Sequence, residues 1–487
     1  MSEKIGDSMS TVTRRTGSSD LIPLGQKFAY AAGMLVNNLQ AAAIPAMMVV
    51  LNLGIGLDPR LVGIIGFIPR IFDAVSDPLM GYISDNTRSQ WGRRRPYIFL
   101  GAIISGLVFA SMWQFPEGQT KTFYFWFFLI GSILYFLTYT IYATPFVAFG
   151  YEMTPDYHER TRLHAFANTA GQLAWIGAPW IWWIMSSFEN KVHGASVLGL
   201  WFGGSIVLLG VVPALFCRER LSDIPEARPP EKQSIFSNLN SFFQGLVTAM
   251  QCKPFTKLCA ATFLVFNGYQ LGISFALYVM IYYLFDGDNK AAGQLNGQWG
   301  SLTAICTIAV IPLTAFIAGK IGKCRTFLVT ISLSIVGYAM KWIGYNPEYP
   351  YWLLASCPFV AFGTGSLFTL MGSMISDVCD YDELESNKRR EGVFGAIYWW
   401  MVKVGMALAL LLSGYLLVAS GFITPQPGST VIVVQSDQTM LCLRVFDVVI
   451  PIVTSTIALI IMSTYEITED KARKTRQLLE QRRGRFL

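Results

Sequence analysis

Charged residues are scarce in this chain. Asp, Glu, Lys and Arg make up 14% of its 487 residues, whereas hydrophobic residues make up 53%. A soluble globular chain has about 25% charged residues, so this sequence lacks the charge that would solvate a surface of its size. Its apolar residues form long blocks of roughly 20, the length that a helix needs to cross a bilayer. The composition therefore excludes a soluble enzyme, a disordered tail and a secreted disulfide-bonded domain, and predicts a polytopic membrane protein.

Patterns typical of metal sites and catalytic sites are also missing. The chain has 3 His and 8 Cys, with no CxxC or HExxH motif. Every Cys except Cys442 falls in an apolar block or on the side that we predict to be cytoplasmic, so we expect no disulfide framework. No nucleophile–base pair or phosphate-binding loop is found. We therefore expect no enzyme, no resident metal, no cofactor and no nucleic-acid partner.

Twelve apolar spans, separated by polar breaks, predict an all-α membrane protein with twelve transmembrane helices. Several spans exceed about 25 residues, so we expect those helices to be tilted or kinked. The spans cover residues 27–53, 61–86, 96–114, 122–151, 162–187 and 197–216, and then residues 255–285, 295–320, 325–346, 350–378, 392–420 and 444–465.

The basic residues predict the orientation of these spans. Most of the 37 Lys and Arg residues fall in the N-terminal segment, in the loops after even-numbered spans, or in the C-terminal segment. By the positive-inside rule those parts are cytoplasmic, and so are both termini. The first 20 residues are polar, which predicts that no cleavable signal peptide is present. We expect a monomer in the plasma membrane, or in the inner membrane of a bacterium, in contact with lipid.

A long polar segment divides the spans into two sets of six, an arrangement typical of a duplicated transporter. Within it, the stretch SIFSNLNSFFQGLVTAM carries one apolar stripe and predicts a helix lying at the membrane interface, with a regulatory docking site as the alternative. The predicted parts are an N-terminal tail, a six-helix bundle, a cytoplasmic linker, a second six-helix bundle and a basic C-terminal tail, over residues 1–26, 27–216, 217–254, 255–465 and 466–487.

The predicted span 61–86 carries an unusual set of charges. Arg70, Asp73, Asp77, Gly81 and Asp85 recur at three- and four-residue steps, which places them on one face of a helix. An ionisable group at mid-membrane costs at least about 2.5–3.5 kcal/mol, so this face must look into the protein or a water-filled cavity. Two carboxylates one turn apart can bind a small cation or share a proton.

Two basic side chains are candidates to balance these carboxylates. Lys403 lies within the span 392–420 and could stand in for the cation when the site is empty. Arg70 could instead neutralise Asp73 in a structural pair, which would leave Asp77 unbalanced. One turn before Lys403, Trp399 could stack on a sugar ring or simply pack.

Neutral polar groups occur in neighbouring spans. Thr140 and Thr144 share a helix face and offer hydroxyl oxygens, although such groups often bond to their own helix. Asn37 and Asn168 are the polar side chains most in need of partners. Lys341 lies near the outer end of its span, so we expect it to extend to the membrane interface and assign it no role.

Three stretches resemble one known family. They are DAVSDPLMGYISDNTRSQWGRRRPYI, TYTIYATPF followed by TPDYHERTRL, and SDVCDYDELESNKRREG followed by Lys403. In this order and spacing they resemble the glycoside–pentoside–hexuronide:cation symporters, a branch of the major facilitator superfamily that includes the melibiose carriers. The resemblance covers nearly the whole chain and implies the major facilitator fold.

The resemblance also implies roles for individual residues. It implies a cation site, for Na⁺ or H⁺, at Asp73, Asp77 and Thr140. Lys403 matches the family's lysine in the eleventh span, and Phe368 aligns with an aromatic residue of its sugar pocket.

The sequence departs from the melibiose carriers at the sugar-binding positions. Asn37 and Ala143 replace acidic residues, Asn168 replaces an arginine, and Val147 replaces a tryptophan. Since two acidic groups are gone, the cavity is less hostile to anions, and we hypothesise an acidic sugar or glycoside as substrate. Our candidates for substrate contacts are Asn37, Tyr139, Asn168, Phe368, Trp399 and Lys403.

Charged residues in the predicted cytoplasmic turns are candidates for an inner gate. The alternative is that they only set the orientation of the spans, as the positive-inside rule describes. They are Asp85, Arg93, Arg94, Arg95, Asp380, Glu383 and Arg390. Together, these observations predict a secondary active transporter that carries a sugar, glycoside or hexuronide with Na⁺ or H⁺ by alternating access. The alternatives are a proton-coupled efflux antiporter of the same fold and a non-transporting membrane sensor.

Overall fold

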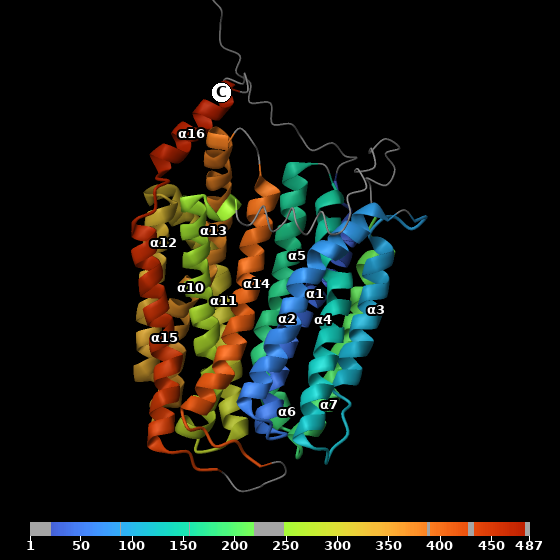
Figure 1. The fold of residues 1–487 in the computed structure, drawn as a ribbon, viewed down its shortest axis with the longest axis vertical. Coiled ribbons are helices and arrows are strands. Elements are labelled where there is room, and N and C mark those ends of the chain that lie inside the picture. The colour runs from blue at the N-terminus through green and yellow to red at the C-terminus, as the bar shows by residue number, and fades with distance from the viewer. Residues whose placement is uncertain are drawn as a thin grey trace, which may run out of the picture.

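The computed structural model describes residues 21–87, 89–154, 156–218, 248–386, 390–426 and 433–482. Within these residues every regular element is a helix, and the long helices run side by side in one bundle (Figure 1). The C-terminal helix marks one end of the bundle, which we call the α16 end. The short helix α6 lies at the opposite end, which we call the α6 end.

The N-terminal half contains the elements up to residue 216. In chain order they are α1 (Leu24–Leu53), α2 (Pro59–Asn86), α3 (Arg95–Met112), α4 (Lys121–Glu152), α5 (Tyr157–Gly177), the 3₁₀ turn η1 (Ala178–Trp180), α6 (Ile181–Ser186), α7 (Lys191–Gly210) and α8 (Val212–Phe216).

The C-terminal half begins after the segment that joins the halves. Its elements are α10 (Lys253–Val279), the π-helical turn η3 (Met280–Leu284), α11 (Asn289–Ile321), α12 (Lys323–Gly344), the 3₁₀ turn η4 (Pro350–Ser356), α13 (Cys357–Ser386), α14 (Glu391–Ala419), α15 (Asp437–Ser463) and α16 (Glu469–Arg482).

Each predicted span coincides with a helix or with a consecutive set of helices. The predicted span 162–187 is the main difference, because α5, η1 and α6 follow one another there around Pro179. A proline removes one backbone donor and breaks the regular hydrogen-bond ladder, which explains the break. The sequence did not predict α16, and the predicted interfacial helix lies largely outside the described residues.

Ten helical segments of the described chain are long and apolar enough to cross a membrane. The helices α2 and α5 are not among them. The charged face of α2 lowers its hydropathy, although at 28 residues it is long enough to span a bilayer. A multi-pass membrane protein is therefore confirmed, whereas the count of twelve spans and the orientation of the termini stay predictions.

The start of α2 shows how local sequence sets a helix boundary. Pro59 occupies the first position, where its missing N–H is no loss. Asp58 caps the helix by accepting a hydrogen bond from the Arg60 backbone N–H at 2.8 Å. Hydrogen bonds from the Arg60 side chain hold the pKa of Asp58 below its usual value, so the cap stays ionised. A negative charge at a helix N-terminus is favourable.

The two halves pack together mainly at the α6 end. There one apolar core includes Trp182 and Met185 of α6 in the N-terminal half and Trp299 and Phe275 of the C-terminal half. A second core, which includes Phe255 and its neighbours, lies within the α16 end of the C-terminal half alone. Contact between the halves runs through α2 against α14, and through α11 against α5, η1 and α6. The site described next lies along the α2–α14 contact.

Candidate functional site

A cluster of charges lies where α2 meets α14. Asp73 and Asp77 stand one turn apart on α2, and Lys403 reaches both from α14. Its Nζ lies 3.0 Å from Asp73 Oδ2 and also forms an ion pair with Asp77 Oδ2. One ammonium therefore bridges two carboxylates of the opposite half, which leaves an excess negative charge in the cluster.

Hydroxyl groups complete this cluster from the side of α4. Thr140 Oγ1 donates to Asp73 Oδ1 at 3.0 Å, and Thr144 Oγ1 donates to Asp77 Oδ1 at 3.1 Å. Ser76 Oγ lies 3.1 Å from Thr140 Oγ1. The spacing of four residues on both α2 and α4 brings the pairs into register. Sequence reasoning identified both threonines but missed Ser76.

Exposure rises through the cluster in one direction. The Asp73 side chain is 1% exposed, whereas the Asp77 side chain, one turn nearer the α16 end, is 31% exposed. Trp399 lies one turn from Lys403 in the same direction and is 56% exposed. The cluster is therefore sealed toward the α6 end and open toward the α16 end.

Arg70 does not join the carboxylates. Among the described residues no ion pair links it to Asp73; its guanidinium carbon lies 4.6 Å from the centre of the Phe136 ring. The side chain is buried, and its Nη2 atom has no hydrogen-bond partner. A buried guanidinium without an anion is costly, and among the described residues this one has an aromatic ring but no carboxylate as its partner.

The predicted substrate-contacting residues fall into two groups. In the N-terminal half, Tyr139 OH donates to Asn37 Oδ1 at 3.3 Å, which joins α4 to α1. In the C-terminal half, the Phe368 and Trp399 rings are nearly parallel with centres 5.9 Å apart. Asn168, on α5, is exposed, and no hydrogen bond joins it to the others within the part of the chain that the structure describes.

The predicted gate residues of the N-terminal half form a network at the α16 end. Arg94 Nη2 lies 2.6 Å from Asp85 Oδ1, and Arg94 Nη1 lies 3.0 Å from Glu152 Oε1. Arg93 also pairs with Glu152, at 2.6 Å. Arg95 instead donates to the Ala214 carbonyl at 2.6 Å. Sequence reasoning missed Glu152, the last residue of α4, because no local pattern shows which loop an arginine will meet.

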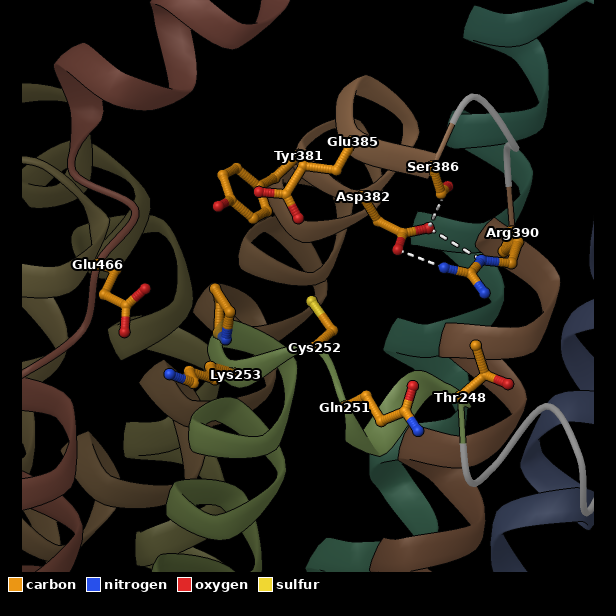
Figure 2. Close-up of a pocket in the computed structure, with 11 residues that line it drawn as sticks. Thr248, Gln251, Cys252, Lys253, Tyr381, Asp382, Glu385, Ser386, Arg390 and Glu466 are labelled. Carbon is orange, nitrogen blue, oxygen red and sulfur yellow. Dashed lines mark hydrogen bonds and ion pairs between the residues drawn. The ribbon is translucent and has the colours of Figure 1, made fainter.

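In the C-terminal half, Arg390 pairs with Asp382. The guanidinium donates to both carboxylate oxygens, at 3.0 Å and 2.5 Å, and Ser386 Oγ lies 3.4 Å from the same carboxylate. Figure 2 shows this pair at the rim of a cavity of about 420 Å³ between the start of α10 and the end of α13. Asp380 and Glu383 lie on the same turns of α13 as Asp382.

The prediction that Lys341 extends to the membrane interface is wrong. Lys341 is 3% exposed, and its Nζ lies 2.6 Å from Asp447 Oδ1. Tyr345 OH donates to the other Asp447 oxygen at 2.5 Å, and the ammonium lies 5.0 Å from the centre of the Trp299 ring. Asp447 was overlooked because it falls near the predicted start of its span. We call Lys341, Asp447 and Tyr345 the buried triad.

The donor groups of the α2–α14 cluster favour a hard cation. Across the described residues no group of three or more His, Cys, Asp or Glu side chains is placed to hold a metal ion. The cluster instead offers two carboxylates and three hydroxyls. Oxygen ligands of this kind suit an alkali cation or a proton, rather than a transition metal held by nitrogen or sulfur.

Comparison with known proteins gives the same picture. The chain is 26% identical to the putative glycoside/cation symporter YagG of Escherichia coli K12, over 88% of each chain. It is 25% identical to the glucuronide carrier protein homolog of the same organism, over 85% of this chain and 86% of the relative. The fold matches the crystal structure of a D-xylose–proton symporter with a TM-score of 0.61 at 14% identity, over 92% of this chain and 99% of the other.

The sequence pattern of one family covers most of the chain. It matches residues 29–469, which include both halves and every residue of the α2–α14 cluster. Its members are transporters and not enzymes. The chain belongs to the family described as MFS/sugar transport protein.

Proposed function

We propose that the protein is a secondary active transporter that couples the inward movement of Na⁺ or H⁺ to the uptake of a sugar, glycoside or hexuronide. The observation that carries this proposal is the bridging of Asp73 and Asp77 by Lys403. The bridge joins the two halves at mid-helix, where a change in its charge can alter how the halves pack.

The cation binds where the ammonium now lies. A cation at Asp73 and Asp77 has the two carboxylates and the hydroxyls of Thr140 and Thr144 within reach. When it binds, Lys403 loses one or both partners, because a second positive charge between the same carboxylates would be repelled. Na⁺ would use several of these oxygens, whereas H⁺ would need only one carboxylate.

The released lysine gives the coupling a physical basis. Lys403 is 29% exposed on the side that opens toward the α16 end, so it can turn to an anionic group of a substrate. The parallel rings of Phe368 and Trp399 lie one turn away and offer a flat surface to a sugar ring. Because linkage is reciprocal, the substrate then tightens cation binding by the same factor.

An acidic sugar fits these charges better than a neutral one. The hexuronate carboxylate would form an ion pair with Lys403. The buried Arg70, whose Nη2 has no partner, adds positive potential one turn from Asp73. The glucuronide carrier homolog is among the relatives, and its name supports this substrate class. The cation then pairs with Asp73 and Asp77 while the acidic sugar pairs with Lys403, so both ligands meet a group of opposite charge.

The conformation described here corresponds to the stage at which substrate leaves or enters on the cytoplasmic side. This follows if the α16 end, which carries the basic tail, faces the cytoplasm. The two halves then rock about the cluster, so that it is exposed to one side of the membrane at a time.

Uptake by the purified protein in proteoliposomes tests the proposal. A Na⁺ or pH gradient should drive accumulation of a radiolabelled glucuronide, and unlabelled neutral glycosides should compete poorly. Asp73→Asn and Asp77→Asn should each abolish gradient-driven accumulation, whereas Glu348→Gln, in an exposed loop of the C-terminal half, should leave it intact. Accumulation by both Asn variants at the wild-type level would refute cation coupling. Efflux driven by an opposing proton gradient would favour the antiporter.

A further inference from the structure

Three glycines of α11 face the N-terminal half at the α6 end. Gly293, Gly297 and Gly300 recur at steps of four and three residues, which places them on one helix face. A Cβ atom on Gly297 would lie 2.4 Å from Trp180 Cδ2, and one on Gly300 would lie 2.3 Å from Pro179 Cγ. Real Cβ atoms do not approach so closely, so only glycine permits this contact. Gly319, on the same helix, has open space around it.

The break between α5 and α6 supplies the opposing surface. The turn η1 places Pro179 and Trp180 directly against the glycines. The carbonyl of Pro179 accepts a hydrogen bond from Asn296 Nδ2 at 2.8 Å, which joins η1 to α11. This hydrogen bond crosses from one half to the other.

A chain of neutral hydrogen bonds fastens the same contact. Trp180 Nε1 donates to Ser301 Oγ at 2.7 Å, and Ser301 Oγ donates to the Ile176 carbonyl at 2.7 Å. Both bonds cross from one half to the other. Ser301 follows Gly300 directly, so the side chain that makes the bonds lies beside the glycine face.

A matching contact closes the other side of the bundle at this end. A Cβ on Gly414 of α14 would lie 2.2 Å from the Pro59 carbonyl oxygen, and one on Gly63 of α2 would lie 3.0 Å from the Leu410 carbonyl oxygen. Tyr278 OH also donates to Asn52 Oδ1 at 3.2 Å, which joins α10 to α1. The halves are therefore in backbone contact on both sides of the α6 end, whereas the cluster at Asp77 is open toward the α16 end.

We propose that the glycine face of α11 and the Pro179–Trp180 turn form the gate that closes the substrate route at the α6 end, with the Trp180–Ser301 hydrogen bond as its latch. This inference rests on the proposed function, because a gate is needed only if the halves rock. Closure requires that η1 approach the α11 backbone. The three glycines allow this approach, and Ser301 holds it.

The distance between the two halves at the α6 end tests the gate without any substrate. Spin labels at Glu189→Cys and Lys290→Cys, both exposed and on opposite halves, would report it by pulsed electron paramagnetic resonance. The native cysteines, none of which forms a disulfide, would first be replaced by serine. The parent protein should show a mainly short distance. Gly297→Ala should shift the population to the longer distance, and Gly319→Ala should not.

A second variant controls for the possibility that Gly297→Ala misfolds. Ser301→Ala adds no bulk and removes both hydrogen bonds of the Ser301 hydroxyl, so it should change the ratio of short to long distances by about 5- to 150-fold, the effect of two hydrogen bonds. An unchanged distance in both Gly297→Ala and Ser301→Ala would overturn the gate. Uptake by the parent protein separates the two proposals. If the parent shows coupled uptake but neither variant changes the distance, the gate alone is refuted. If the parent shows no coupled uptake but the variants shift to the longer distance, the function alone is refuted.

Discussion

Two lysines within helices of the C-terminal half have opposite surroundings. Lys341 meets one carboxylate, Asp447, within its own half, and Tyr345 satisfies the remaining oxygen. Lys403 meets two carboxylates of the other half and stays 29% exposed. The first arrangement is neutral and closed, so it can only brace α12 against α15. The second is negative and open, so it can exchange its cation. The difference between a structural charge and the transport charge that we propose lies in the charge balance and the solvent access, not in the residue type.

Removing the lysine of the buried triad should have the largest effect. Lys341→Met leaves Asp447 buried and uncompensated, which we expect to destabilise the protein by about 3–5 kcal/mol. Thermal unfolding in detergent, followed by size-exclusion chromatography, measures this loss. Lys403→Met is the matched control and should unfold near the wild-type temperature, because Asp77 is open to water and a cation can replace the ammonium between the two carboxylates.

The double variant Lys341→Met, Asp447→Leu sharpens this test. It replaces the pair by apolar side chains of similar size, and such replacements are often neutral. We therefore expect most of the stability to return. Equal losses for Lys341→Met and Lys403→Met would show that the two lysines do not differ in the way described.

Much of the fold and part of the cluster follow from the sequence. Long apolar blocks can be recognised in the sequence because a charged side chain within a membrane-spanning helix is energetically costly. For the same reason the charges of Asp73, Asp77 and Lys403 stand out. Lys341 and Asp447 were not paired in advance, because both lie near span ends, where a lysine can reach water without any partner. Their contact depends on how α12 packs against α15, and no local sequence pattern predicts this packing.

The proposed gate could not be predicted from the sequence either. Glycines are common in membrane helices, so Gly297 and Gly300 carry no signal until the position of Trp180 is known. Pro179 was visible as a helix breaker, but the sequence does not say which helix its turn will face. The same limit applies to Asp382, which pairs with Arg390 although Asp380 and Glu383 were the residues singled out.

Removing only the hydroxyl of the buried triad should have a smaller effect. Tyr345→Phe keeps the ring but takes away the second hydrogen bond to Asp447. Hydrogen bonds to charged groups contribute about 1.5–3 kcal/mol, so we expect a loss in that range by the same unfolding measurement. A wild-type unfolding temperature would mean that the Lys341 ion pair alone satisfies Asp447.

For the second lysine, the expected effect is on coupling rather than on stability. Lys403→Met should still bind the cation, since both carboxylates remain, but the cation should no longer raise the affinity for an acidic sugar. Typical coupling corresponds to a change in affinity of about 5- to 150-fold. Isothermal titration of a glucuronide with and without Na⁺, and at two pH values, measures it. Coupling that persists in Lys403→Met would contradict the release of the lysine as its cause.

The hydroxyl groups of the cluster should contribute least. Thr140→Val and Thr144→Val each remove one oxygen, and we expect cation affinity to fall by about two- to tenfold, the effect of one hydrogen bond. Thr140 should matter more, because its partner Asp73 is buried and cannot turn to water. A larger effect at Thr144, in a cation titration monitored by tryptophan fluorescence, would reverse this order.

The kind of contacts at the α6 end predicts how the closed state depends on temperature. The contacts that join the halves there are apolar surfaces, glycine backbones and neutral hydrogen bonds, such as Trp180 to Ser301. Burial of apolar surface lowers the heat capacity and becomes less favourable on cooling. The closed state should therefore be favoured by warmth and should open in the cold. The balance between the two states of this transporter would then depend on the temperature at which the cell grows.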